Sequence, residues 1–106
     1  MSDTWGLDRT AEGLFVHGEI DLATGEAFEE RAIEAVMDAP VSSVLIDLSG
    51  VTFMDSEGTR ALIRVLEFRS GKSLVVQPSR PVFKLLQLVA STDGVSSDVE
   101  LLEPPA

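Results

Sequence analysis

The 106-residue sequence contains no cysteine and only one histidine, His17. Without cysteine, neither a disulfide framework nor a thiolate metal site can form, and the cytoplasm is the simplest compartment for such a chain. His17 has no second histidine or cysteine with which to complete a metal site, so we interpret it as a partly exposed strand residue. We therefore expect no metal site in this protein.

Long hydrophobic runs are also absent. No apolar stretch approaches the ~20 residues that a membrane-spanning helix needs. The first residues, Met1 to Thr4, lack the basic region followed by an apolar stretch that marks a secretion signal. The sequence therefore predicts a soluble, cytoplasmic protein with no membrane partner.

Basic residues are scarce, since 8 lysines and arginines stand against 18 acidic residues, which gives a formal net charge of −10. The imbalance is concentrated in residues 1–50, where eleven acidic residues accompany only Arg9 and Arg31. Nucleic acid is not an expected partner, because phosphate contacts need clustered lysine and arginine. The acidity either serves only to maintain solubility or favours a basic protein as partner.

The most informative stretch is VLIDLSGVTFMDSEGTRALIRVLEFRS, residues 44–70. It opens with the apolar run Val44–Ile46, which is typical of a buried strand, and continues to a second apolar patch, Val51–Met54. From Ala61 onward the apolar residues recur at helical spacing. The local prediction is strand, loop and helix.

The start of that helix should place a serine at the surface. Asp55 and Ser56 are both suitable N-cap residues, Glu57 adds negative charge to the first turn, and Gly58 allows close backbone approach. Counting in steps of four puts Ser56 on one solvent-facing stripe with two arginines, of which Arg60 is the first. We therefore expect an accessible hydroxyl at a helix N-terminus.

Strand and helix patterns alternate along the chain, which predicts an α/β domain with a mixed sheet of four to five strands packed with amphipathic helices. The right-handed crossover rule makes the third and fourth strands parallel, with a helix between them. We expect one domain, residues 1–106, with a short disordered tail from about residue 103. The expected strands are Thr4–Asp8, Leu14–Gly18, Val44–Ile46, Ser73–Val76 and Val99–Leu102. The expected helices have Thr24, Asp55 or Ser56, and Ser79 as N-caps, and the first should bury Ala27, Phe28, Ala32, Ala35 and Val36.

Two segments carry a family resemblance. GEIDLAT, Gly18 to Thr24, is followed roughly twenty residues later by VLIDLSGVTFMDSEG, Val44 to Gly58. The pair resembles the motifs of the bacterial anti-sigma factor antagonists, which are small STAS-domain proteins, and the order of elements resembles that family over nearly the whole chain. The resemblance implies a STAS-like fold and a cytoplasmic regulator of transcription that is not an enzyme.

The resemblance also implies partners and a switch. In this family the unphosphorylated antagonist binds an anti-sigma factor, a serine kinase with a histidine-kinase-like ATP-binding domain, and so frees the sigma factor. The kinase phosphorylates the serine of an Asp-Ser motif, a phosphoserine phosphatase reverses this, and the antagonist binds no cofactor permanently. By this resemblance Ser56 is the phosphorylation site.

Residue by residue, the motif falls on Asp55, Ser56 and Gly58, and Asp21 matches an acidic loop residue near the partner-binding surface. The chain departs from the family where Glu57 replaces Ser or Thr and where Thr59-Arg60 replaces Leu-Gly. From the charges we formulate a hypothesis specific to this chain, that Arg60 compensates for Glu57 and holds a phosphate on Ser56. The implied partner-binding residues are Asp21, Asp55, Ser56, Glu57, Gly58 and Arg60.

Several alternatives stay open at this point. Ser56 could serve only as a helix cap, or as the nucleophile of a hydrolase in which His17 is the sole available base. Asp47 could be the phospho-aspartate of a receiver domain, although the early strand offers no adjacent acid pair for Mg²⁺. A STAS domain could also work without a kinase, as a scaffold or as an accessory subunit of a lipid or anion transporter.

Overall fold

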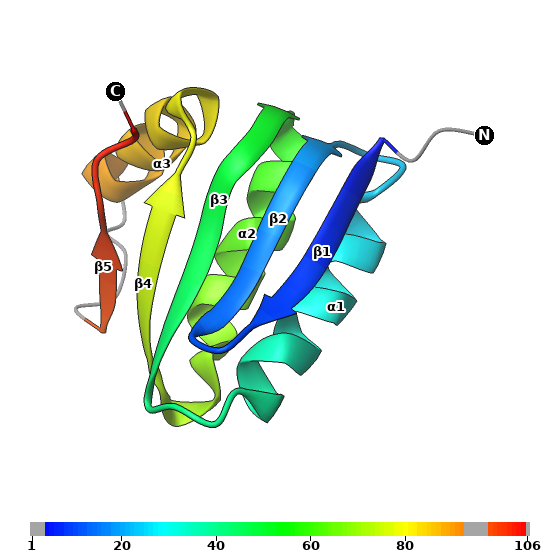
Figure 1. Ribbon diagram of the computed structural model, residues 1–106. Coiled ribbons are helices and arrows are strands. Elements are labelled where there is room, and N and C mark those ends of the chain that lie inside the picture. The colour runs from blue at the N-terminus through cyan, green and yellow to red at the C-terminus, as the bar shows by residue number, and fades with distance from the viewer. Residues whose placement is uncertain (1–3, 93–97, 106) are drawn as a thin grey trace.

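The computed structural model describes residues 4–92 and 98–105, and in it strands alternate with helices as the sequence predicts (Figure 1). None of the helices in these two ranges is long and apolar enough to cross a membrane. In chain order the elements are β1 (Trp5–Thr10), β2 (Gly13–Ile20), α1 (Gly25–Asp38), β3 (Ser43–Met54), α2 (Ser56–Phe68), the 3-10 turn η1 (Arg69–Gly71), β4 (Ser73–Pro78), α3 (Arg80–Thr92) and β5 (Val99–Leu101).

The described strands form one mixed sheet in the order β1-β2-β3-β4-β5. β1 and β2 form an antiparallel hairpin, whereas β2, β3, β4 and β5 run parallel to their neighbours. α2 connects β3 to the parallel strand β4, as the crossover rule predicts. The predicted fold class is confirmed. The receiver-domain alternative is wrong, because that fold has the strand order 2-1-3-4-5.

α1 and α2 lie side by side against one face of the sheet (Figure 1). The inner sides of these helices and the inward side chains of the strands form one hydrophobic core, in which Phe28, Ile46 and Leu62 are fully buried. α3 contributes Val82 and Leu86 to the same core. Each such side chain stabilises the fold by about 1.5–3 kcal/mol relative to leaving it in water.

The buried stripe of α1 differs from the predicted one at its first residue. Ala27 is exposed, and Gly25 is buried instead, because the first turn of α1 packs close to the first turn of α2. The rest of the predicted stripe is confirmed: Phe28, Ala32, Ala35 and Val36 are buried.

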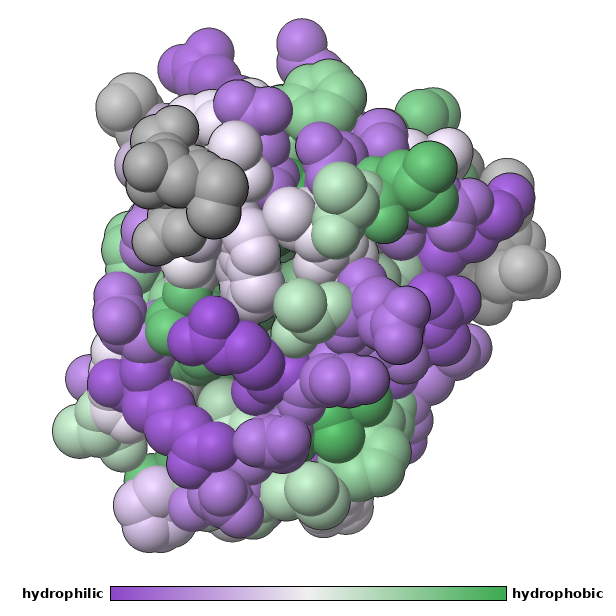
Figure 2. Space-filling model, turned by 90° about the vertical axis from the view of Figure 1, so that its right-hand side faces the viewer, coloured by the Kyte–Doolittle hydropathy of each residue, from purple (hydrophilic) through white to green (hydrophobic). Residues whose placement is uncertain are grey.

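The outer side of α1 carries much of the negative charge of residues 1–50. Figure 2 shows the side of the molecule with β1 and α1, and hydrophilic side chains cover much of it. Glu26, Glu30, Glu34 and Asp38 are all exposed on this helix. One of these charges is neutralised locally, since Arg9 Nη1 lies 2.9 Å from Asp38 Oδ2.

β3 is longer than predicted. The two apolar patches expected at Val44–Ile46 and Val51–Met54 belong to one strand of 12 residues. Gly50 breaks the apolar pattern, yet it pairs with His17 of β2 and leaves room for the side chains of Phe15 and His17. Pairing with a neighbouring strand therefore outweighs the local break in the sequence.

Two predicted N-caps occupy the expected positions but do not cap with their side chains. Thr24 precedes α1, and its hydroxyl donates to the Glu19 carbonyl oxygen at 3.1 Å instead of accepting from the helix. The Ser79 carbonyl oxygen accepts the first helical bond of α3, from Phe83 at 2.8 Å. The Ser79 hydroxyl is buried and finds no partner among the described residues.

Lys72 holds the C-terminal end of α1. Its Nζ donates to the carbonyl oxygens of Val36 at 2.7 Å, Met37 at 3.2 Å and Ala39 at 2.7 Å. The last carbonyl groups of a helix have no intrahelical donor, and a cation at this end also complements the helix dipole. The residue just before β4 thus fixes a helix more than thirty positions earlier in the chain.

Candidate functional site

The cap of α2 is Asp55, and Ser56 is left at the surface. Asp55 Oδ1 accepts a hydrogen bond from the Gly58 amide at 2.9 Å, and the Asp55 backbone is extended, as is usual for an N-cap. Ser56 is the first residue of the helix, and its side chain is exposed. The interpretation of Ser56 as the helix cap is therefore wrong, and the hydroxyl is accessible as expected.

Asp55 also ties α2 to the loop that precedes α1. Its Oδ2 accepts from the Leu22 amide at 3.2 Å. Its own amide donates to the carbonyl oxygen of Ile20, also at 3.2 Å. The two segments that carry the family resemblance, far apart in the sequence, thus lie against each other at the ends of β2 and β3.

Asp21 shapes this loop. Its Oδ1 accepts from the backbone amides of Ala23 at 3.0 Å and Thr24 at 3.2 Å, which is the pattern of an Asx turn. Asp21 is half-buried, whereas Leu22 beside it has 76% of its surface exposed. The sequence analysis missed Leu22. The signal for it was a large apolar residue inside a turn held by Asp21 and Thr24.

Gly58 lies beneath the surface of the site. It is buried in the first turn of α2, where a Cβ would collide with the carbonyl oxygen of Ile20 at the end of β2. The absence of a side chain therefore allows α2 to begin directly against this strand. The close backbone approach expected for Gly58 is confirmed.

Two arginines on the exposed stripe of α2 are already engaged. Arg60 Nη1 lies 2.8 Å from Glu57 Oε1, and the two side chains are 65% and 41% exposed. Arg64 Nε lies 2.7 Å from Glu29 Oε1 and so bridges α2 to α1. Exposed ion pairs such as the first contribute only about 0.2–1 kcal/mol, so Arg60 can exchange its partner at little cost.

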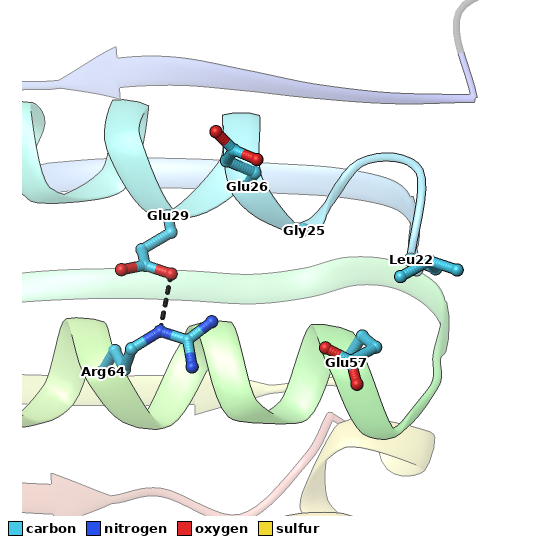
Figure 3. A pocket seen from close by; sticks show the side chains of 6 residues that line it. All are labelled: Leu22, Gly25, Glu26, Glu29, Glu57 and Arg64. Atoms are coloured by element: carbon cyan, nitrogen blue, oxygen red, sulfur yellow. Dashed lines mark hydrogen bonds and ion pairs between the residues drawn. The ribbon is translucent and has the colours of Figure 1, made fainter.

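A groove of about 340 Å³ runs along the line where the N-terminal parts of α1 and α2 meet (Figure 3). The Glu29–Arg64 ion pair crosses it, and Leu22 lies at the end next to the loop. Three carboxylates against one guanidinium group leave the groove acidic. Its lining consists of Leu22, Gly25, Glu26, Glu29, Glu57 and Arg64.

The metal-site and hydrolase interpretations depend on which side chains the fold brings together among the described residues. In residues 4–92 and 98–105, no group of three His, Cys, Asp or Glu side chains is placed to hold a metal ion. Phe15 and His17 of β2 alternate with the buried Leu14 and Val16, and the His17 ring stacks on Phe15 with centroids 5.8 Å apart. The fold does not bring His17 to Ser56, so the hydrolase alternative lacks its base.

Comparisons with known proteins agree with this architecture. Residues 12–99 match the family model of the STAS domain. The chain is 44% identical over 54 residues to the anti-sigma-F factor antagonist RsfB of Mycobacterium tuberculosis, an alignment that covers 51% of this chain and 43% of RsfB. It is 29% identical over 73 residues to the anti-sigma F factor antagonist of Lysinibacillus sphaericus, which covers 66% of this chain and 62% of that protein. The chain therefore spans less than two thirds of either relative.

Solved structures show the same fold. The anti-sigma factor antagonist SpoIIAA in its unphosphorylated form superimposes with a TM-score of 0.58 at 21% identity, over 93% of this chain and 87% of that one. An anti-sigma factor antagonist from Mycobacterium paratuberculosis gives a TM-score of 0.55 at 29% identity, over 84% and 80% of the two chains. The resemblance seen in the sequence is confirmed: this chain belongs to the STAS-domain family.

Proposed function

We propose that this chain is an anti-sigma factor antagonist, which binds an anti-sigma factor through the surface at the start of α2 and so frees a sigma factor. The observation that carries the proposal is the exposed Ser56 hydroxyl in the first turn of α2, left free because Asp55 caps the helix. The names of the similar proteins from M. tuberculosis and L. sphaericus support the same function.

The proposed interface consists of residues that face solvent and residues that hold them in place. Ser56 and Arg60 are exposed, and Asp21 and Glu57 are half-buried at the same surface. We add Leu22, whose exposed side chain supplies apolar contact area beside the serine. Two residues hold this surface in place: Asp55 caps α2, and Gly58 lets α2 approach β2.

The proposed partner is an anti-sigma factor that is also a serine kinase with an ATP-binding domain, and phosphorylation of Ser56 ends the complex. A phosphoryl group brings about −1.5 to −2 charges and three acceptor oxygens. At Ser56 it would stand beside Glu57 and the acidic groove, so a partner docked there would meet repulsion and a costly desolvation. A phosphoserine phosphatase would restore binding, with no change of fold.

In this proposal the protein works in the cytoplasm, without a cofactor, nucleic acid or membrane, and catalyses no reaction itself. The alternative is a STAS scaffold or transporter accessory that is not switched. The specific feature that supports the alternative is the Glu57–Arg60 ion pair, which places a permanent carboxylate and a large cation beside Ser56.

The test is intact-mass analysis after incubation with ATP and a candidate kinase encoded beside the gene, together with titration of binding to that kinase. We expect one added phosphoryl group in the natural chain and none in Ser56→Ala. Ser42→Ala is the matched control, because Ser42 is another exposed serine and lies in the loop before β3.

Three results would contradict the proposal in different ways. Phosphate incorporation that persists in Ser56→Ala would place the modification elsewhere. Binding of the kinase without any phosphate incorporation would favour the unswitched interface, and no binding at all would remove the antagonist function itself.

A further inference from the structure

Resting on the proposed phosphorylation of Ser56, we propose that the phosphate takes Arg60 away from Glu57. Arg60 then becomes the counter-ion of the phosphate, and Glu57 becomes an unpaired carboxylate at the edge of the groove between α1 and α2. The switch is thus an exchange of ion pairs within one helical turn.

The spacing on α2 places Arg60 within reach of both anions. Arg60 follows Ser56 by four residues and Glu57 by three, and residues at these separations are neighbours on a helix surface. In the unmodified protein Arg60 Nη1 lies 2.8 Å from Glu57 Oε1. With 65% of its side chain exposed, Arg60 can turn to the other neighbour without disturbing the core.

The phosphate is the stronger competitor for the guanidinium group. A carboxylate offers two oxygens and one charge, whereas a phosphate offers three oxygens and nearly two charges, and arginine binds it through two parallel hydrogen bonds. The residues on either side of Ser56 in the chain, Asp55 and Glu57, are both acidic, and Glu57 lines the groove together with Glu26 and Glu29. Arg60 is therefore the cation placed to offset the added charge.

The second arginine of the stripe provides a contrast. Arg64 lies one turn farther from Ser56 and bridges to Glu29 of α1 at 2.7 Å. Glu29 is only 25% exposed, so this pair is more shielded from water than the Glu57–Arg60 pair. Arg64 should keep its partner when Ser56 is phosphorylated.

The exchange carries the effect of the phosphate into the groove. Glu57 lines the groove together with Glu26 and Glu29, and its charge is at present compensated by Arg60. Once Arg60 has moved, Glu57 adds an uncompensated charge to a surface that is already acidic. A partner would then be repelled both at Ser56 and along the groove.

The experiment uses the full chain with phosphoserine installed at position 56 during translation, so that it does not depend on any kinase. The phosphate is titrated by ³¹P NMR, with Arg60→Gln as the test variant and Arg64→Gln as the matched control. A neighbouring cation favours the dianion and lowers the pKa of the phosphate, so Arg60→Gln should raise that pKa. At pH 6 we expect the ratio of dianion to monoanion to fall about threefold in Arg60→Gln and to stay unchanged in Arg64→Gln.

A second measurement detects the exchange itself. The side-chain Nε–Hε resonance of Arg60 should shift on phosphorylation, while that of Arg64 stays in place. Equal phosphate titrations in the two variants, or an Arg60 resonance that does not move, would overturn the ion-pair exchange. Neither result would bear on whether a kinase modifies Ser56, which the mass analysis decides separately.

Discussion

At the scale of single residues, one missing side chain determines where α2 can begin. Gly58 is buried against the carbonyl oxygen of Ile20, and a methyl group there would meet backbone, which cannot rotate away. Gly25 is also buried in a first turn, as the first residue of α1, yet a Cβ on it would lie 3.6 Å from the Glu57 carbonyl oxygen, an ordinary contact. The two glycines therefore form a matched pair for mutation.

We expect Gly58→Ala to destabilise the protein and Gly25→Ala to leave its stability unchanged or slightly raised. Overpacking costs roughly 1–3 kcal/mol, while alanine gains about 1 kcal/mol over glycine inside a helix. For Gly58→Ala the steric cost dominates, and a net loss of about 1–2 kcal/mol should appear in urea unfolding. Equal unfolding midpoints for the two variants would show that the end of β2 yields to the added methyl group.

The individual residues of the site differ in how far the sequence predicts them. Ser56, Asp55 and Gly58 follow from a local pattern, because a helix start depends on neighbours within a few positions. The turn around Leu22 is local too, but a large apolar residue is expected to be buried, so its exposure is not predicted. The Glu29–Arg64 ion pair also escapes prediction, since its partners are 35 positions apart and meet only once α1 and α2 pack together.

At the scale of helices and strands, the change of hydrophobic period along the chain predicts the kinds of element correctly and their ends less well. The residues of α1 and α2 keep a helical repeat long enough to identify each helix. The full length of β3 is not predicted, because Ser49 and Gly50 interrupt its apolar pattern. Only pairing with β2 shows that the strand continues. Thr24 and Ser79 likewise mark helix starts, but neither side chain caps its helix.

The end of α1 provides a prediction at this scale. Lys72→Met keeps the length and apolar stem of the side chain but removes the ammonium group that binds three carbonyl oxygens. We expect a loss of about 1–2 kcal/mol in the free energy of unfolding, because these hydrogen bonds involve a charged donor and a helix end. Lys84→Met, on the exposed side of α3, is the control and should change stability little. A similar loss in both variants would assign the effect to the change of net charge.

At the scale of the whole molecule, the net charge of −10 should govern how fast a basic partner arrives. Charge complementarity speeds association, and salt screens it with a range of about 10 Å at 0.1 M. Under the proposed function, we expect the association rate constant with the anti-sigma factor to fall roughly 10-fold between low and physiological salt. The dissociation rate should change much less. An association rate that is independent of salt in stopped-flow measurements would contradict this role of the acidic surface.

The parallel course of β2 and β3 places the proposed interface at one end of the molecule and the β1–β2 turn at the other. Both strands run toward the first turns of α1 and α2. At their opposite ends the chain makes two turns, where the Glu12 carbonyl oxygen accepts from the Leu45 amide and the Ser42 carbonyl oxygen accepts from the Ser73 amide. Because the natural chain has no thiol, Ala11→Cys would offer a single attachment point in that distant turn. A dye there would follow complex formation through slower tumbling without covering the contact surface, whereas the same dye on Ala23→Cys, beside Leu22, would sense the partner directly.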